Sequence, residues 1–385
     1  METFFSDIYN YYYSRRKNMA GSVYGNLFTV STWGESHGKG LGVVVDGCPA
    51  GIEICEADIQ MFLDRRRPGV TKYATPRKES DEVEILSGVF EGKTTGTPIS
   101  MMVRNTSQKS KDYSDIASCY RPGHADYTFD EKYGFRDYRG GGRSSGRETI
   151  GRVAAGAVAM KILDRLGIQV RAYVTSIGEI EIDYEKMAME NIERSPLRMP
   201  DLEASARAED YLCEQMKNHD SAGGVIECVV DGMPAGIGEP VFGKLDAALA
   251  QAVMSIGAVK GVEIGDGFLA ARKRGSENND GFGTGESGEI VSLTNHAGGI
   301  LGGISSGSPI VLRAAFKPTP SIFSSQKTVS QSGKEIEIQI KGRHDPVIVP
   351  RAVVVVEAMT ALVLVDKLFA GMTSQMERIV SFYKE

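Results

Sequence analysis

The sequence predicts a mixed fold of helices and strands, α/β or α+β, arranged as two similar halves. Apolar residues with strand spacing and with helix spacing alternate along the 385 residues. In addition, residues 44–52 (VVDGCPAGI) recur almost unchanged as residues 229–237 (VVDGMPAGI), which indicates a duplicated architecture. A hydrophobic content of 41% supplies enough apolar residues for a substantial core.

The repeat extends upstream at the same offset, where residues 35–38 (ESHG) align with residues 220–223 (DSAG). Each half is therefore expected to hold a strand, a turn with Gly and Pro, and a following helix. The histidine at position 37 has Ala222 as its counterpart. Because a purely architectural turn gives no reason to prefer histidine, this difference indicates chemistry in the first half.

Helices are predicted wherever apolar residues recur with helical spacing. The pattern covers residues 56–66, about 147 to 166, and 241–255. Pro68-Gly69 ends the first of these helices and Gly167 ends the second. Between the patterned segments, we expect polar glycine-rich loops at residues 275–288 and 295–308.

The most apolar segment, residues 352–370, invites comparison with a membrane helix. It carries Glu357, Asp366 and Lys367, however, and charges of this kind are costly inside a bilayer. We therefore predict a buried helix.

Charge and cysteine content exclude several classes of protein. With a formal net charge of -6, the chain has no bulk attraction for nucleic acid or for an anionic membrane. Five scattered cysteines without a Cys-x-x-Cys pair argue against a disulfide framework and a zinc site, and favour the cytoplasm. Residues 1–18 are tyrosine-rich without the apolar run of a secretory signal, so we interpret them as a disordered extension before a single domain at 19–385.

A glycine-rich segment, residues 139–148 (RGGGRSSGRE), leads directly into the predicted 147–166 helix. Ser145 and Glu148 fit a capping box at the start of that helix. Free backbone N–H groups, the helix dipole and the flanking arginines together suit a phosphate or a carboxylate. An ordinary capped helix behind a flexible loop explains the pattern equally well, whereas an RNA-binding Arg-Gly box does not suit an acidic chain that continues into a patterned helix.

Arginines and histidines supply the other candidates. Successive side chains of a helix diverge, so only one residue of Arg65-Arg66-Arg67 is expected to enter a pocket, and we select Arg66. Four of the five histidines occupy turns rich in glycine or proline, where proton transfer is a suitable role: His37, His124, His296 and His344. Metalloprotease and dinucleotide-binding motifs are absent, and residues 88–94 are one residue too short for a phosphate-binding loop. The residues alone indicate an enzyme or binder of a small, multiply anionic ligand.

Three long segments carry a resemblance to a known family. They are residues 34–38 (GESHG) continuing to 46–49 (DGCP), residues 142–156 (GRSSGRETIGRVAAG), and residues 343–357 (RHDPVIVPRAVVVVE). In this order they resemble the signatures of the chorismate synthases, over roughly residues 23–369. Two shorter segments, 121–126 (RPGHAD) and 317–319 (KPT), also resemble the family.

This resemblance implies a β-α-β sandwich, two sheets enclosing a helical layer, in a homotetramer. It implies conversion of 5-enolpyruvylshikimate 3-phosphate to chorismate by trans-1,4-elimination of phosphate, with reduced FMN and no net redox change. A chain without a spare domain is expected to be monofunctional and to need an external source of reduced flavin.

The resemblance also assigns roles to individual residues. It implies that His37 protonates the departing phosphate, that His124 lies by the flavin, and that Asp345 assists removal of the C6 proton. The implied substrate contacts are Arg66, Lys72, Arg121, Arg139, Arg147 and Arg343. The implied FMN contacts are Arg143, Ser144, Ser145, Gly257, Ala258, Gly302, Lys317, Pro318, Thr319, Pro320, Ser321 and again Arg343.

Two of these positions depart from the family pattern. Lys72 replaces an arginine common in relatives, so a point charge replaces a bidentate fork. Pro320 replaces a common serine and removes a backbone donor. Two rival classes remain open at this point: a non-catalytic protein that binds FMN or another anion, and an ordinary flavin oxidoreductase.

Overall fold

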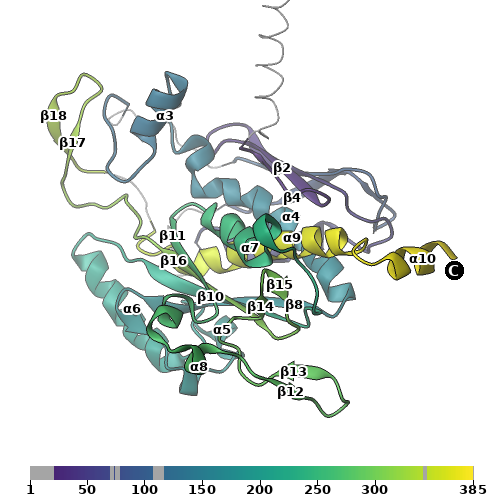
Figure 1. Cartoon of the computed structure of the whole chain (residues 1–385). Helices are drawn as coiled ribbons and strands as arrows, with labels where there is room; N and C mark the ends of the chain where they lie inside the picture. The colour runs from purple at the N-terminus through teal and green to yellow at the C-terminus, as the bar shows by residue number, and fades with distance from the viewer. Residues whose placement is uncertain (1–20, 70–72, 74–78, 107–116, 341–344, 385) are drawn as a thin grey trace, which may run out of the picture.

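The computed structural model describes residues 21–69, 73, 79–106, 117–340 and 345–384. Two five-stranded antiparallel sheets enclose a layer of helices (Figure 1). This arrangement confirms the predicted α+β sandwich. The extension predicted at residues 1–18 lies outside the described residues.

The first sheet belongs to the first half of the chain. Its strands, in spatial order, are β1 (Val23–Tyr24), β2 (Thr29–Gly34), β3 (Gly40–Asp46), β7 (Ile99–Arg104) and β4 (Val83–Ser87). Alternation along β3 turns Leu41, Val43 and Val45 toward the helices, and each of these side chains is at most 1% exposed.

The second sheet repeats this plan with later residues. Its order is β11 (Val259–Ile264), β16 (Ile310–Phe316), β10 (Gly224–Asp231), β8 (Gln169–Ile177) and β9 (Ile180–Glu181). The central strand β10 pairs with β8 and β16 as β3 pairs with β2 and β7. The two halves of the sequence therefore fold as two copies of one sheet.

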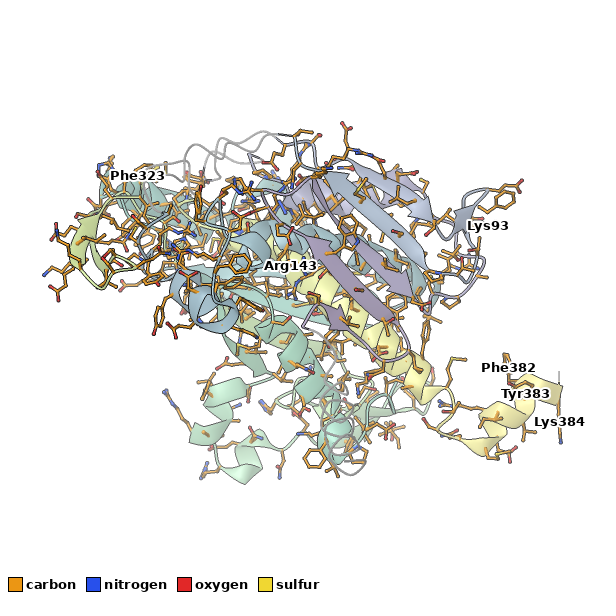
Figure 2. The ribbon with its side chains drawn as sticks, turned by 90° about the horizontal axis from the view of Figure 1, so that it is seen from above. Lys93, Arg143, Phe323, Phe382, Tyr383 and Lys384 are labelled. Carbon is orange, nitrogen blue, oxygen red and sulfur yellow. The ribbon has the colours of Figure 1, made fainter. Side chains whose placement is uncertain are left out.

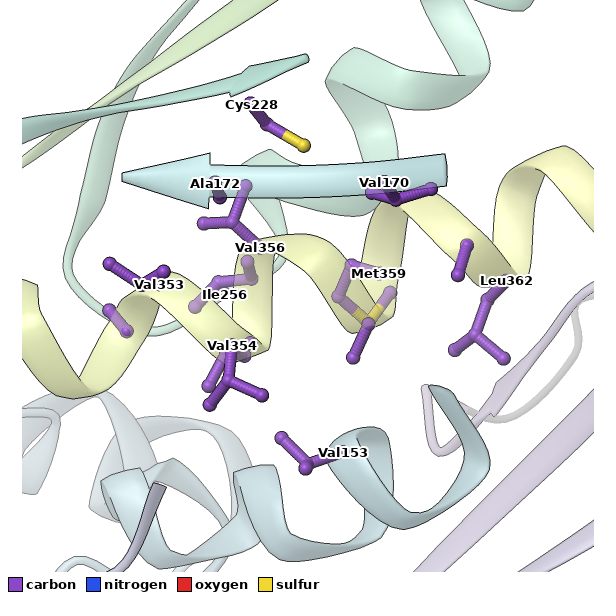
Figure 3. Close-up of a cluster of buried hydrophobic side chains, with 14 of the residues drawn as sticks. Val153, Val170, Ala172, Cys228, Ile256, Val353, Val354, Val356, Met359 and Leu362 are labelled. Atoms are coloured by element: carbon purple, nitrogen blue, oxygen red, sulfur yellow. The ribbon is translucent and has the colours of Figure 1, made fainter. Parts of the chain in front are cut away.

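Four helices fill the space between the sheets: α2 (Glu56–Arg66), α4 (Thr149–Arg165), α7 (Leu245–Met254) and α9 (Val349–Gly371). Figure 3 shows α9 between the strand that carries Val170 and Ala172 and the helix that carries Val153. Because α9 is enclosed on all sides, it is apolar around most of its circumference. Gly156 permits the close crossing of α4 and α9, since an added Cβ would lie 2.3 Å from the Ala358 Cβ.

The three charged residues that follow Arg351 in α9 have separate structural partners. Glu357 accepts two hydrogen bonds from Arg65 at 2.7 and 2.9 Å, Asp366 accepts from the backbone N–H groups of residues 26–28, and Lys367 donates to the Gly243 carbonyl. The prediction of a buried helix is confirmed. None of the helices in the described part of the chain combines the length and apolarity that a membrane crossing requires.

The predicted helix over 56–66 has the expected bounds, while two others begin later than expected. The 147–166 pattern forms α4 from Thr149, after two 3-10 turns at Gly142–Ser144 and Gly146–Glu148. The capping box is wrong: Ser145 accepts from the Arg147 N–H, but the Glu148 carboxylate binds Arg152 at 2.9 Å. Residues 241–243 form a 3-10 turn before α7.

The loops predicted at 275–288 and 295–308 contain regular structure. The first holds α8 (Gly275–Asn278) and β12 (Phe282–Thr284), which pairs with β13 (Ile290–Ser292). The second holds a hairpin of β14 (Ile300–Leu301) and β15 (Ile304–Ser305). The remaining elements are β5 (Val89–Phe90), β6 (Lys93–Thr94), α3 (Asp126–Tyr133), α5 (Asn191–Arg194), α6 (Leu202–Lys217), β17 (Gln326–Val329), β18 (Glu335–Ile338) and α10 (Met376–Lys384).

Candidate active site

His37 lies in the turn between β2 and β3, where the imidazole is held from two sides. Its Nδ1 is 3.1 Å from the Ser36 hydroxyl. The backbone of Gly140 passes over the ring so closely that a Cβ there would lie 2.5 Å from Nδ1, and Gly140 has φ of +149°. Ring orientation is therefore set by the glycine-rich segment.

Arg143 fastens that segment to the first sheet. Its guanidinium donates to the Gly34 carbonyl at 3.1 Å, to the Thr32 hydroxyl at 2.6 Å and to the Ser22 hydroxyl at 3.3 Å. Ser144 donates to the Gly141 carbonyl within the same segment. In the described structure these two side chains stabilise the loop that covers His37.

Arg66 and Arg147 converge on one buried carboxylate, that of Asp81. Asp81 lies 2.9 Å from Arg147 and 3.3 Å from Arg66, and Glu79 also pairs with Arg147. Burial lowers the pKa of Arg66 to about 10, although the Asp81 carboxylate acts in the opposite direction. The Nε of Arg66 is buried and has no hydrogen-bond partner among the residues that the structure describes, so within this part of the chain the guanidinium retains an unused donor.

Asn105 and Arg351 extend this pair into a network. The side-chain amide oxygen of Asn105, Oδ1, accepts a hydrogen bond from Nε of Arg147 at 2.7 Å. Arg351 donates to the Arg66 backbone carbonyl at 3.0 Å and to Asp345 at 2.6 Å. Arg66 contacts Arg147 directly, and Arg351 links Arg66 to Asp345, so three residues expected to act in one site belong to one network.

His124 occupies the turn before α3 and uses both ring nitrogens. Nδ1 is 3.0 Å from the Pro122 carbonyl and Nε2 is 2.9 Å from the Ser321 hydroxyl. A carbonyl only accepts, so Nδ1 carries the proton and, in the neutral ring, Nε2 accepts from Ser321. Burial, and then the Arg121 charge, lower the pKa of His124 below its ordinary value, which favours that neutral ring.

The segment 317–321 lies beside His124. Lys317 donates through its backbone N–H to Ala258 at 2.9 Å and through Nζ to Gly123 at 2.8 Å. Ala258 has φ of +74°, an uncommon conformation for a residue with a Cβ. The Thr319 hydroxyl is buried and finds no hydrogen-bond partner in the described part of the chain, and Pro320 packs against Gly123. The structure therefore brings Ala258 and residues 317–321 together around His124.

Other predicted arginines are engaged with nearby carboxylates. Arg121 makes a buried bidentate pair with Asp126, both contacts being 2.7 Å. Arg139 pairs with Asp137 two residues away and is half exposed. Arg121 and Arg139 therefore each have an intramolecular carboxylate partner. A ligand anion that binds either arginine would share that guanidinium with the carboxylate.

The described structure separates Gly302 from Gly257, although the resemblance assigns both to FMN. Gly302 lies in the β14–β15 turn, next to Gly303, whose carbonyl accepts from Leu245 at the start of α7. Gly257 follows the far end of α7, and ten helical residues span about 15 Å. Lys72, Arg343 and His344 lie outside the described residues.

Sequence reasoning missed three residues at the centre of the network: Asp81, Asn105 and Arg351. Arg351 falls within the third motif, residues 343–357, so its position in the sequence could have indicated a place in the site. Nothing local distinguishes Asp81 or Asn105 from an ordinary surface residue, because their importance depends on partners distant in the sequence.

A histidine held in a turn, two buried arginines and a carboxylate linked through Arg351 suit an acid–base enzyme of small anionic substrates. The comparisons with known proteins agree. The model of the chorismate synthase family matches residues 28–369. A chorismate synthase of Lachnoclostridium phytofermentans is 66% identical over 367 residues, which is 95% of this chain and 100% of that protein.

A chorismate synthase of Lachnospira eligens is 65% identical with the same coverage. A crystal structure of chorismate synthase aligns with a TM-score of 0.74 at 36% identity, covering 94% of this chain and 97% of that one. The chain belongs to the chorismate synthase family. It is a lyase of the shikimate pathway that eliminates phosphate from 5-enolpyruvylshikimate 3-phosphate to give chorismate, and its family requires a reduced flavin.

Proposed function

We propose that the flavin is reduced FMN, supplied from outside, and that the network around Arg66, Arg147 and Asp345 together with His37 and His124 carries out the elimination. The observation that carries this proposal is the contact network itself, since it joins residues from four separate segments of the chain. Bound reduced FMN would supply transient electron density that assists cleavage of the carbon–oxygen bond.

The residues of the 317–321 segment fit a flavin. A buried hydroxyl without a partner, as in Thr319, is costly unless a ligand satisfies it. An added Cβ at Gly257 would meet no atom within 4 Å, so the chain leaves space beside Ala258. In this assignment Lys317, Thr319 and Ser321 hold the cofactor, with Pro318 and Pro320 shaping the segment, while Arg143, Ser144 and Ser145 support it from the glycine-rich side.

Substrate anions would be bound by the buried arginines. Arg66 retains an unused Nε donor and Arg147 lies beside it, and charge-assisted bonds of this kind are strong in a desolvated site. Arg121, Arg139, Lys72 and Arg343 are assigned to the same substrate by family resemblance. A substrate with one phosphate and two carboxylates requires several such partners.

Proton transfers are assigned to His37 and Asp345. His37 would donate to the leaving phosphate, with its ring aimed by Ser36 and Gly140. Asp345, oriented by Arg351, would accept the C6 proton. In each turnover Asp345 gains one proton and His37 loses one. Release of a proton from Asp345 to solvent and uptake of one by His37 return both side chains to their starting states.

His124 would stay neutral in the free protein and gain a proton only next to an anionic flavin. Its lowered pKa and its two hydrogen bonds support this role. Protonation would turn Nε2 into a donor, which requires the Ser321 hydroxyl to rotate.

We also propose a cytoplasmic homotetramer. Helix α10 extends away from the body of the protein, and Phe382 and Tyr383 lie at its tip (Figure 2). Met376, Phe382 and Tyr383 are each at least 67% exposed, and exposed apolar faces are typical of subunit contacts. Light scattering of the purified protein measures the assembly directly, and a monomer at micromolar concentration would contradict it.

An anaerobic turnover experiment tests the cofactor. FMN is reduced with a measured amount of dithionite, the 3-phosphate substrate is added, and chorismate is counted per flavin oxidised. Many turnovers per flavin are expected, because the product is at the oxidation level of the substrate. One chorismate per flavin oxidised would favour the oxidoreductase, and FMN binding without chorismate would favour the non-catalytic binder.

A further inference from the structure

We propose that Asn105 is a positioning residue for the elimination, because it fixes the turn that carries His37 relative to the guanidinium of Arg147. This inference rests on the roles proposed for His37 and Arg147. Asn105 follows β7 directly and is half-buried, and its own backbone N–H donates to the Lys39 carbonyl at 3.1 Å. The residue is therefore anchored before its side chain makes any contact.

The side chain of Asn105 joins two parts of the site. Its Nδ2 donates to the carbonyls of Glu35 and Gly38, at 3.0 and 2.9 Å, which flank His37 on both sides. Its Oδ1 accepts from Nε of Arg147 at 2.7 Å. The reversed amide would place an oxygen against two carbonyls and an NH₂ group against an N–H donor, so only one orientation satisfies the contacts.

Arg147 is held from the opposite side by acids. Asp81, whose side chain is fully buried, contacts its NH1 at 2.9 Å, and Glu79 pairs with the same nitrogen. The Arg147 guanidinium therefore contacts Asn105 at Nε and the two acids, Glu79 and Asp81, at NH1. These contacts come from different segments of the chain and restrict its position. Small displacements of a positioned group cost roughly 10²-fold in rate per ångström, so such a clamp has catalytic consequences.

The second half of the molecule provides an internal comparison. Strands β3 and β7 of the first sheet correspond to β10 and β16 of the second. In this alignment the cross-strand pair Gly40 and Arg104 matches the cross-strand pair Val225 and Ala315. One step further along, Asn105 corresponds to Phe316, which is 4% exposed. The half that has Ala222 in place of His37 therefore also has an apolar residue in place of Asn105. The amide occurs where the histidine occurs, which a purely architectural role does not explain.

The test compares Asn105→Ala and Asn105→Asp with the unchanged protein, using reduced FMN and the 3-phosphate substrate without oxygen. Asn105→Ala should lower kcat by about 10- to 100-fold. Asn105→Asp keeps an acceptor for Arg147 but places a carboxylate against two carbonyls. It should lower kcat while changing substrate Kd less than Asn105→Ala does.

Asn295→Ala is the matched control, since Asn295 also clamps two loops, donating to Pro309 and accepting from Gly299, both at 2.8 Å. Its kcat should stay near that of the unchanged protein. Urea midpoints of all variants report any loss of folding separately from kcat.

A double-mutant cycle separates positioning from general weakening. In the Arg147→Ala background, Asn105→Ala should cost much less than it does alone, because the group that it positions is gone. Near-normal kcat in Asn105→Ala, or full additivity in the cycle, would overturn the inference about Asn105. If His37→Ala and Arg147→Ala nevertheless have low activity, the proposed function still stands. Near-normal activity in both of those single variants would overturn the proposed function and this inference together.

Discussion

The two halves of the molecule share a framework and differ in what the equivalent turn does. In the first half the turn carries His37, and Asn105 fastens it to Arg147. In the second half the corresponding Ala222 is 2% exposed, and its N–H donates to the Pro346 carbonyl at 2.9 Å. One turn bears the histidine proposed as proton donor, and the other anchors the residues that follow Asp345. The two halves therefore share a framework, and His37 and Asn105 are among the positions at which they differ.

The largest effect that this comparison predicts is at His37. His37→Ala should lower kcat by roughly 10²–10⁴-fold, the range for a lost general acid, while the fold stays intact. His219→Asn is the control, since His219 has φ of +60°, which asparagine tolerates, and lies outside the network. Anaerobic chorismate assays measure both variants, and near-normal turnover in His37→Ala would remove its proton-transfer role.

A somewhat smaller effect is predicted at Gly140. Gly140→Ala should displace the His37 ring, because the new Cβ would lie 2.5 Å from Nδ1, and kcat should fall by about 10- to 100-fold. Gly146→Ala in the same segment meets no atom within 4 Å and has no positive φ, so it should retain activity. Equal activity of the two variants would mean that the glycine-rich segment does not orient the histidine.

The third prediction concerns how the first half is fastened to the shared helix layer. Burial raises the pKa of Asp366, but hydrogen bonds from the N–H groups of Leu27, Asn26 and Phe28 outweigh this and lower the pKa below its ordinary value. A lowered folded-state pKa contributes stability above the unfolded pKa, and that contribution disappears as pH falls through the folded value.

Asp366→Ala should therefore destabilise the protein by about 2–3 kcal/mol at pH 7, since the hydrogen bonds that residues 26–28 donate to a charged acceptor are lost. The difference from the unchanged protein should shrink below about pH 4. Urea titrations at several pH values measure it. A difference that is constant between pH 7 and pH 3 would exclude the ionised carboxylate as its source.

The smallest predicted effect is a loss of stability that should be equal in the two halves when a turn hydroxyl is removed. Thr94 and Ser305 hold equivalent turns: the hydroxyl of each donates at 2.6 Å, to Pro49 and Pro234 respectively, and accepts from the N–H of Ile52 or Ile237. Thr94→Ala and Ser305→Ala should each cost about 1–2 kcal/mol and leave kcat unchanged. A markedly larger effect in one half would show that the duplicated framework is not used equally.

The sequence revealed the framework only in part. The 44–52 and 229–237 repeat was visible, but the second repeat, in which residues 94–99 (TTGTPI) match 305–310 (SSGSPI), was not recognised. Its offset is 211, whereas that of the first repeat is 185, because the second half has additional residues between the two segments. The 88–94 segment that approaches a phosphate-binding pattern is the hairpin of β5 and β6, equivalent to that of β14 and β15.

The site was predictable where a residue type implies its chemistry. Histidines and arginines in glycine-rich segments stand out because their charge and pKa suit anions and proton transfer. Asp81 was not predictable, since its φ of +48° and its two arginine partners exist only after folding. Arg65 pairs with the buried Glu357 of α9, nearly 300 residues later, and no local pattern indicates that pair.

Helix α9 also has a kinetic consequence. Asp366 in this helix binds residues 26–28, which lie up to 340 positions earlier in the chain, and the same helix packs on strands of the second sheet. Loops of that length must close before their contacts return any free energy, so folding that depends on them is slow. Until α9 docks, the second sheet lacks the helix that packs on β8 and β10, and the partly folded chain is prone to self-association. The same interlocking makes both halves open together, so we expect one cooperative unfolding transition.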